Sequence, residues 1–263
     1  MTYSHHVPRK RFGQHFLSDQ AIIQRIIAAL NPKPDQHLVE IGPGQGALTV
    51  PLLKHIKQLE VVELDRDLIP ELERRTHGAL TIYSADALTF DFGSIKKDER
   101  QLRIVGNLPY NISTPLIFHL LTFASIVSDM LFMLQKEVAE RLAAAPDTDD
   151  YGRLSVMVQY HCEVEVLFDV PPEAFYPPPQ VQSSIIHLVP FKTLPCPAKD
   201  YLLFESIVKN AFGQRRKTLR NSLRHLVSDD IWQQINISSN LRAENLSVQD
   251  FVSIANACAR ISS

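Results

Sequence analysis

The stretch HLVEIGPGQGALTV, from His37 to Val50, decides the fold. An apolar run ends at Ile41 and is followed at once by a loop with Gly42, Gly44 and Ala47 at the spacing of a nucleotide-binding fingerprint. Glycine allows the sharp backbone turn and the close approach to a ligand that such a loop needs. We therefore expect a strand, a glycine loop and a helix near residues 47–56, with an adenosine-containing cofactor at the loop.

Helical and strand patterns alternate on both sides of this loop. The first helix is expected to begin after Ser18 or Asp19, either of which can cap it, and to end before Pro32. This alternation predicts an α/β, Rossmann-like fold, with a mostly parallel sheet, helices on both faces, and ligands at the carboxyl ends of the strands. Strands are expected at residues 37–41, 59–64, 80–84, 102–106, 129–134, 162–170 and 183–189, the last two as an antiparallel edge hairpin, and further helices near 66–75, 115–123, 135–145 and 154–160.

Acidic residues stand at the ends of two of these strands. Glu63 lies near the end of the second strand, where a carboxylate can accept hydrogen bonds from a ribose diol, and Asp86 follows the third and can accept one from an adenine amine. Solvated strand-end carboxylates are the plain alternative for both residues. The glycine loop and Glu63 also suit a nicotinamide cofactor, so a dehydrogenase is a competing interpretation.

The motif NLPY, Asn107 to Tyr110, follows the apolar run at residues 102–106. The amide oxygen of Asn107 and the carbonyl of Leu108 can accept the two hydrogens of an exocyclic amine and direct its lone pair at a methyl donor. Pro109 biases Leu108 toward an extended conformation, and Tyr110 can stack on a flat base. A turn that starts the next helix is the alternative. Together with the two carboxylates, the motif favours S-adenosylmethionine over a nicotinamide.

The composition fits a compact soluble enzyme of the cytoplasm. The chain has 263 residues, of which 45% are hydrophobic, and a formal net charge of −2. No apolar run approaches the roughly 18 residues of a membrane span. The three cysteines stand far apart, which argues against a disulfide framework or a zinc site and indicates a reducing compartment. Prolines interrupt the pattern near Phe191, so we expect a cofactor-binding domain over residues 1–190 and a small helical domain over 191–263.

Positive charge gathers locally despite the small net charge. If a helix continues through residues 212–226, Arg216, Arg220 and Arg224 form one stripe on it, because they recur every fourth residue. Like charges at this spacing repel one another, and bound phosphates would relieve that repulsion. A solvated face is the alternative. The candidate RNA contacts are Arg9, Lys10, Arg11, Arg153, Arg215, Arg216, Lys217, Arg220 and Arg224.

Several longer motifs resemble the KsgA/RsmA family of small-subunit ribosomal RNA adenine dimethyltransferases. The resemblance runs from about Arg9 to the C-terminal helices. The motifs that carry it are RKRFGQHFL (9–17), VEIGPGQGALT (39–49), ELDR (63–66), NLPYNIST (107–114), LQKEVAERL (134–142), YGRLSV (151–156), PPPQVQSS (177–184) and FGQRRKTLRNSL (212–223).

The resemblance implies N6,N6-dimethylation of two adjacent adenines in the 3′-terminal hairpin of 16S ribosomal RNA. S-adenosylmethionine would supply the methyl groups and leave as S-adenosylhomocysteine, without a metal. The target base would be extruded from its stack. The partner would be the small ribosomal subunit, and the protein a monomer that binds no membrane. Carried over motif by motif, the cofactor contacts would come from His15, Leu17, Gly42, Gly44, Glu63, Asp86 and Asn107.

The resemblance bears on two further residues. His15 departs from the family, which often has asparagine there, although histidine can also donate to or accept from a cofactor carboxylate. Phe175, in AFYPPP, is the candidate for a second aromatic wall opposite Tyr110, with a core aromatic as the alternative. The competing functions are a DNA adenine or large-subunit RNA methyltransferase, the dehydrogenase, and a ribosome-assembly factor that acts chiefly by binding.

Overall fold

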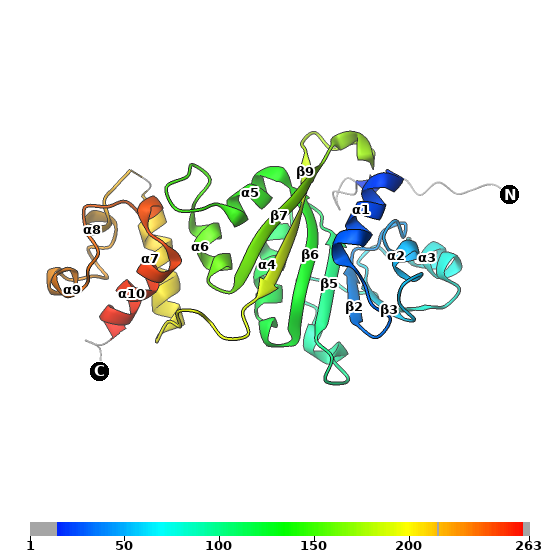
Figure 1. Cartoon of the computed structure of the whole chain (residues 1–263), viewed down its shortest axis with the longest axis horizontal. Helices are drawn as coiled ribbons and strands as arrows, with labels where there is room; N and C mark the ends of the chain where they lie inside the picture. The colour runs from blue at the N-terminus through cyan, green and yellow to red at the C-terminus, as the bar shows by residue number, and fades with distance from the viewer. Residues whose placement is uncertain (1–14, 215, 260–263) are drawn as a thin grey trace. The chain divides into compact units, whose positions relative to one another are not determined.

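The computed structural model describes residues 15–214 and 216–259, and these residues fold as two compact units (Figure 1). The first unit combines the N-terminal residues up to Ala139 with Glu165–Pro190, and the second combines Glu140–Val164 with the chain from Phe191 onward. The predicted boundary near Phe191 coincides with one crossing between the units. Residues 140–164 precede this boundary and group with the second unit, while the division into a cofactor-binding domain and a small helical domain stays a prediction.

A central sheet forms the framework of the first unit and confirms the α/β prediction. It has seven strands in the order β4-β3-β2-β5-β6-β9-β7. Strands β2 to β6 run parallel to one another, and β9 is antiparallel to β6. The strands are β2 (His37–Ile41), β3 (Leu59–Val62), β4 (Leu80–Tyr83), β5 (Leu102–Asn107), β6 (Val127–Gln135), β7 (Cys162–Val170) and β9 (Ser183–Pro190), and a separate ladder joins β1 (Phe16–Leu17) to β8 (Phe175–Tyr176).

Helices pack against this sheet, and others form the regular structure of most of the segment from Phe191 onward in the second unit. In the first unit they are α1 (Gln20–Leu30), α2 (Thr49–Leu52), α3 (Ile69–Thr76), α4 (Ser113–Leu121) and the start of α5 (Lys136–Ala143). The second unit contains α6 (Arg153–Gln159), α7 (Tyr201–Phe212), α8 (Leu219–Ser222), α9 (Asp229–Gln234) and α10 (Val248–Ala259). No helix within residues 15–214 and 216–259 is both long enough and apolar enough to cross a bilayer.

Helix α1 shows how the sequence builds the core. Asp19 caps it by accepting hydrogen bonds from the backbone of Ala21 and Ile22, and Asn31 ends it in the left-handed conformation at φ 47°. The helix lies across one face of the sheet (Figure 1), and its apolar side chains pack against that face. These side chains and their partners on the strands form one buried cluster that includes Ile22, Ile23, Ile26, Ile27, Leu30, Leu38, Val61, Val105, Leu131 and Ile185.

The prediction of one continuous helix over residues 212–226 is wrong. Helix α7 ends at Phe212, and Thr218 adopts an extended conformation with ψ 159° before the short α8 begins. The first amides of α8 donate to carbonyls of another segment, Leu219 to Leu241 and Arg220 to Ser239. Since these amides are satisfied outside a continuing helix, the three arginines at 216, 220 and 224 do not form a helical stripe.

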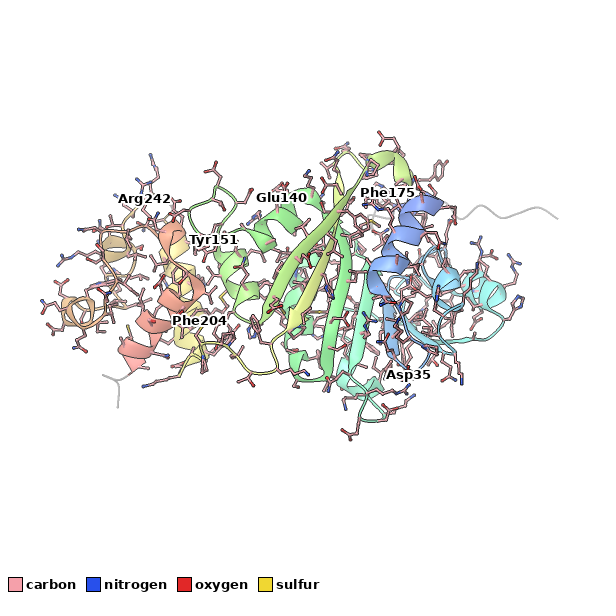
Figure 2. All side chains as sticks on the ribbon, in the orientation of Figure 1. Asp35, Glu140, Tyr151, Phe175, Phe204 and Arg242 are labelled. Atoms are coloured by element: carbon pink, nitrogen blue, oxygen red, sulfur yellow. The ribbon has the colours of Figure 1, made fainter. Side chains whose placement is uncertain are left out.

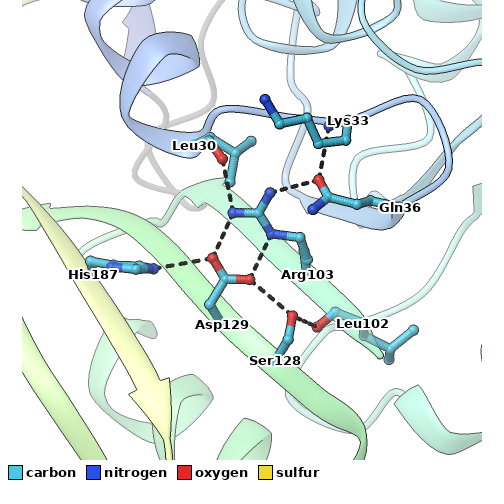
Figure 3. A network of polar contacts seen from close by, with 8 residues as sticks. All are labelled: Leu30, Lys33, Gln36, Leu102, Arg103, Ser128, Asp129 and His187. Carbon is cyan, nitrogen blue, oxygen red and sulfur yellow. Dashed lines mark hydrogen bonds and ion pairs between the residues drawn. The ribbon is translucent and has the colours of Figure 1, made fainter. Parts of the chain in front are cut away.

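A buried polar network joins the amino ends of the strands (Figure 3). The guanidinium of Arg103 on β5 donates to both oxygens of Asp129 on β6, at 2.7 Å each. It also donates to the carbonyl of Leu30 at 2.8 Å and to the side-chain oxygen of Gln36 at 2.7 Å. His187 on β9 contacts Asp129 at 3.1 Å. Burial alone would raise the pKa of Asp129, but the bonds from Arg103 and His187 hold that pKa well below its usual range.

Asp129→Asn should destabilise the protein strongly, because it leaves the buried Arg103 charge unpaired. We expect a loss of about 3–5 kcal/mol in unfolding free energy at pH 7 by denaturant titration. Since the folded-state pKa of Asp129 is depressed, its contribution is present above the unfolded value of about 4 and is lost as the pH falls. The variant should therefore lose less stability than the wild type on acidification.

The control is Glu71→Gln, which removes the exposed ion pairs of Glu71 with Arg74 and Arg75. Exposed pairs contribute little, so this variant should stay close to the wild type at pH 7. If Asp129→Asn is as stable as Glu71→Gln, the network does not stabilise the sheet.

Candidate active site

The glycine loop follows β2 directly, as the sequence predicted. Gly42, Gly44 and Gly46 have φ of 66°, 56° and 83°, a region that favours glycine. The amide of Gly42 donates to the carbonyl of Val62 and so ties the loop to β3. A Cβ on Gly44 would lie 3.2 Å from the ring of Phe16, which shows that this ring covers the loop closely.

A cavity of about 360 Å³ opens beside this loop at the carboxyl ends of the strands. The chain places β3 and β4 on one side of β2, and β5 and β6 on the other, so the crevice between β2 and β5 is where ligands bind in such sheets. The volume lies within the usual range of small-molecule sites. The predicted residues that line it are His15, Leu17, Gly42, Gly44, Glu63, Asp86, Asn107, Leu108, Pro109 and Tyr110.

Glu63 presents a buried carboxylate to the cavity. One oxygen accepts from the amide of Gly44 at 3.1 Å and the other from the amide of Asp65 at 2.7 Å. Burial raises the pKa of Glu63, although the bonds from Asp65 and Gly44 partly oppose the increase. Asp86 is held in a similar way, because its side chain accepts from the amide of Leu88 at 2.9 Å. Both carboxyl groups therefore have fixed orientations.

Glu40 is a site residue that the sequence analysis missed. It lies on β2, lines the cavity and is only 2% exposed. Thr49 donates to it at 2.7 Å, and burial raises its pKa to about 8. An acidic residue within the apolar run HLVEI is the signal that could have identified it, because such a group is rarely buried without a specific role.

The amide of Asn107 is oriented by the backbone of His15. Its nitrogen donates to the His15 carbonyl at 3.0 Å, which leaves the amide oxygen as an acceptor for a ligand. The next residue is held as well, since the amide of Leu108 donates to the carbonyl of Met133 at 3.2 Å. The structure thus fixes the start of the NLPY motif against β1 on one side and β6 on the other.

Tyr110 is positioned by two contacts. Its hydroxyl forms a 2.8 Å hydrogen bond with that of Ser183, and burial raises its pKa. Its ring stacks on the imidazole of His15, with centroids 5.9 Å apart and planes inclined by 25°. The Nδ1 atom of His15 in turn lies 2.8 Å from the carbonyl oxygen of Pro177. His15 therefore links the NLPY motif to the segment after β8.

Phe175 does not form the expected second wall. It pairs with Leu17 across the β1–β8 ladder, is 4% exposed, and belongs to the same core cluster as α1. Figure 2 labels it beside the start of this helix. Its side chain does not line the cavity. The core alternative is the one that the structure supports.

None of the candidate RNA contacts that the structure describes is among the residues that line the cavity. Arg153 pairs with Glu205 at 3.0 Å and Arg220 with Asp229 at 2.6 Å, and both pairs are exposed. Arg224 donates to the ring of His225 at 3.0 Å. Of the remaining candidates, Arg216 and Lys217 lie in the turn before α8, and Arg9, Lys10, Arg11 and Arg215 lie outside the described residues.

Comparison with known proteins finds one family along nearly the whole chain. The family model described as ribosomal RNA adenine dimethylase matches residues 5–260. A protein of Pseudomonas syringae pv. tomato named ribosomal RNA small subunit methyltransferase A is 56% identical over 252 residues, which are 95% of this chain and 94% of that protein. A protein of the same name from Vibrio parahaemolyticus is 51% identical over 253 residues, 95% of this chain and 94% of its own.

Two solved structures are similar over most of their length. A dimethyladenosine transferase from Plasmodium falciparum has a TM-score of 0.75 at 27% identity and covers 91% of this chain and 96% of its own. The 23S rRNA methyltransferase ErmE has a TM-score of 0.72 at 24% identity and covers 93% of this chain and 99% of its own. The second likeness concerns the fold alone.

Gly106→Ala should disrupt both the fold and the cavity. A Cβ at this position would lie 2.6 Å from the carbonyl oxygen of Ile41, so β5 would have to move away from β2. We expect a loss of about 1–3 kcal/mol or more in unfolding free energy. Gly152→Ala is the control, because nothing lies within 4 Å of a Cβ there. Equal stability of the two variants would show that β2 and β5 tolerate a wider spacing.

Proposed function

The chain belongs to the ribosomal RNA adenine dimethylase family, and we propose that it dimethylates N6 of two adjacent adenines in the 3′-terminal hairpin of 16S ribosomal RNA. The observation that supports this best is the Asn107 amide, which is fixed by His15 so that its oxygen remains an acceptor beside the glycine-loop cavity. Relatives named small subunit methyltransferase at 51–56% identity favour this substrate over large-subunit RNA. We place the reaction in the cytoplasm during small-subunit biogenesis.

The cavity fits S-adenosylmethionine. Glu63 would accept hydrogen bonds from the ribose diol, Asp86 would accept one from the adenine amine, and the loop at Gly42 and Gly44 admits the close approach of a ligand. His15 and Leu17 line the same cavity from the N-terminal side. When bound, this cofactor supplies a methyl group on a positively charged sulfur, ready for attack by a nucleophile. A nicotinamide enzyme has no support in the family match.

The residues of the NLPY motif would prepare the target nitrogen. An exocyclic amine is a poor nucleophile because its lone pair is delocalised into the base. The Asn107 oxygen and the Leu108 carbonyl would accept its hydrogens and favour a pyramidal nitrogen with the lone pair directed at the methyl group. Tyr110 would stack on the extruded base. The proton leaves the ammonium product after transfer, so the chain needs no covalent intermediate and no dedicated base.

The second unit would supply contacts to the RNA backbone. Arg153, Arg216, Lys217, Arg220 and Arg224 belong to it and remain our candidates, together with Arg9, Lys10, Arg11 and Arg215. The exposed ion pairs of Arg153 and Arg220 do not oppose this role, because such pairs contribute little and can be exchanged for phosphate. We therefore expect small ribosomal subunits to be bound through phosphate contacts outside the cavity. We also propose that the protein acts as a monomer.

The decisive experiment measures methylation of small-subunit ribosomal RNA directly. Mass spectrometry should find dimethyladenosine at the two hairpin positions in cells that contain the protein and unmodified adenosine in cells that lack it. Purified protein should restore the modification to subunits from the deficient cells. Dimethyladenosine that persists without the protein would overturn the proposal.

Asn107→Ala should slow methyl transfer while leaving cofactor affinity within about an order of magnitude. We expect the rate at saturating RNA to fall roughly 100-fold or more, because a preorganised acceptor is lost. Asn210→Ala is the control, since Asn210 is an exposed asparagine of α7 that does not line the cavity. If single-turnover assays give Asn107→Ala the same rate of methyl transfer as the wild type, the NLPY motif serves only as a turn before the next helix.

Glu63→Ala should weaken S-adenosylmethionine binding by about 1.5–3 kcal/mol, the range for hydrogen bonds to a charged group. Calorimetric titration of the purified protein measures this loss directly. Glu73→Ala, which removes an exposed carboxylate from α3, should bind as the wild type does. If the two variants bind with the same affinity, Glu63 does not hold the ribose.

A further inference from the structure

The two faces of the β1–β8 ladder differ in burial, and the cavity reaches residues on both. Residues that pair directly across a ladder carry their side chains on the same face, and successive residues alternate. The pairs are Phe16 with Tyr176 and Leu17 with Phe175. Leu17 and Phe175 are 6% and 4% exposed and belong to the core. Phe16 and Tyr176 therefore share the opposite face.

This opposite face begins at the cavity wall. Phe16 lines the cavity, and its ring lies over Gly44. Tyr176, its direct partner, does not line the cavity and is 71% exposed. The two aromatic side chains thus lie on one face of the ladder, Phe16 at the cavity and Tyr176 exposed outside its lining.

The position of Tyr176 is fixed from the site itself. Pro177, the next residue, accepts the contact from His15 Nδ1 at 2.8 Å, and the same imidazole stacks on Tyr110. The segment that carries Tyr176 is therefore coupled to the ring that we propose for the target base. Single exposed aromatic residues are common, but this one is held beside a cavity whose proposed substrate is a polynucleotide.

We propose that Tyr176 stacks on the unpaired base next to the target adenine. Aromatic rings bind single-stranded nucleic acid by stacking on successive bases, whatever their sequence. With one target base at Tyr110, its neighbour in the strand must remain outside the cavity, where an exposed ring lies on the face shared with Phe16. The core role within this ladder belongs to Phe175, so Tyr176 is not needed for packing. This inference rests on the proposed function.

A substitution series at Tyr176 tests the stacking. Tyr176→Ala should raise the KM for small subunits that lack the two dimethyladenosines by roughly tenfold or more, with kcat much less affected. Tyr176→Phe should keep the wild-type KM, because stacking does not need the hydroxyl. Tyr176→Leu has a side chain of substantial apolar size without an aromatic ring and should behave like the alanine variant. Val181→Ala, which trims another exposed apolar residue of the same unit, should match the wild type.

The outcomes separate this inference from the proposed function. Calorimetry should give the same S-adenosylmethionine affinity for every variant, which shows that the cavity is intact. An active wild type whose KM is unchanged in Tyr176→Ala overturns the stacking role alone. A KM that rises in Tyr176→Phe as much as in Tyr176→Ala also overturns it, because the hydroxyl would then be the group that matters. A wild type that cannot methylate the subunits overturns both proposals.

Discussion

The close approach of β2 and β5 is the constraint on which the site depends. Gly106 lies so near the carbonyl oxygen of Ile41 that even a methyl group would collide with it. This contact brings the glycine loop after β2 and the NLPY motif after β5 to opposite sides of one crevice. Two short motifs that are distant in the sequence therefore line one cavity, where the proposed function would have one bind the methyl donor and the other the acceptor.

The sequence predicted the framework and most of the cavity because both follow from local patterns. The strand at 37–41 and the edge strand at 162–170 have the predicted bounds, because short segments rich in β-branched residues favour strands. The strand-end rule then placed Glu63, Asp86 and Asn107 at one edge of the sheet, and the cavity contains all three.

The errors occurred where distant segments decide local structure. The spacing of the arginines predicted a charged stripe along one continuous helix. Instead, the first backbone amides of α8 donate hydrogen bonds to the carbonyls of Leu241 and Ser239. Phe175 was expected at the cavity, but its pairing with Leu17 turns its side chain into the core. In the sequence, His15 was a cofactor contact implied by the family resemblance and a departure from asparagine. Its contacts with Asn107, Tyr110 and Pro177 depend on the fold and cannot be read from the motif.

The Arg103 network has a consequence for how such a protein can diverge. It joins the strands at their amino ends, whereas the cavity lies at their carboxyl ends. The buried charges of this network are thus separate from the residues that line the cavity. Residues around the cavity can therefore change during evolution while Arg103 and Asp129 remain paired. A protein of this fold can in this way acquire new nucleic-acid substrates and keep the network that stabilises its sheet.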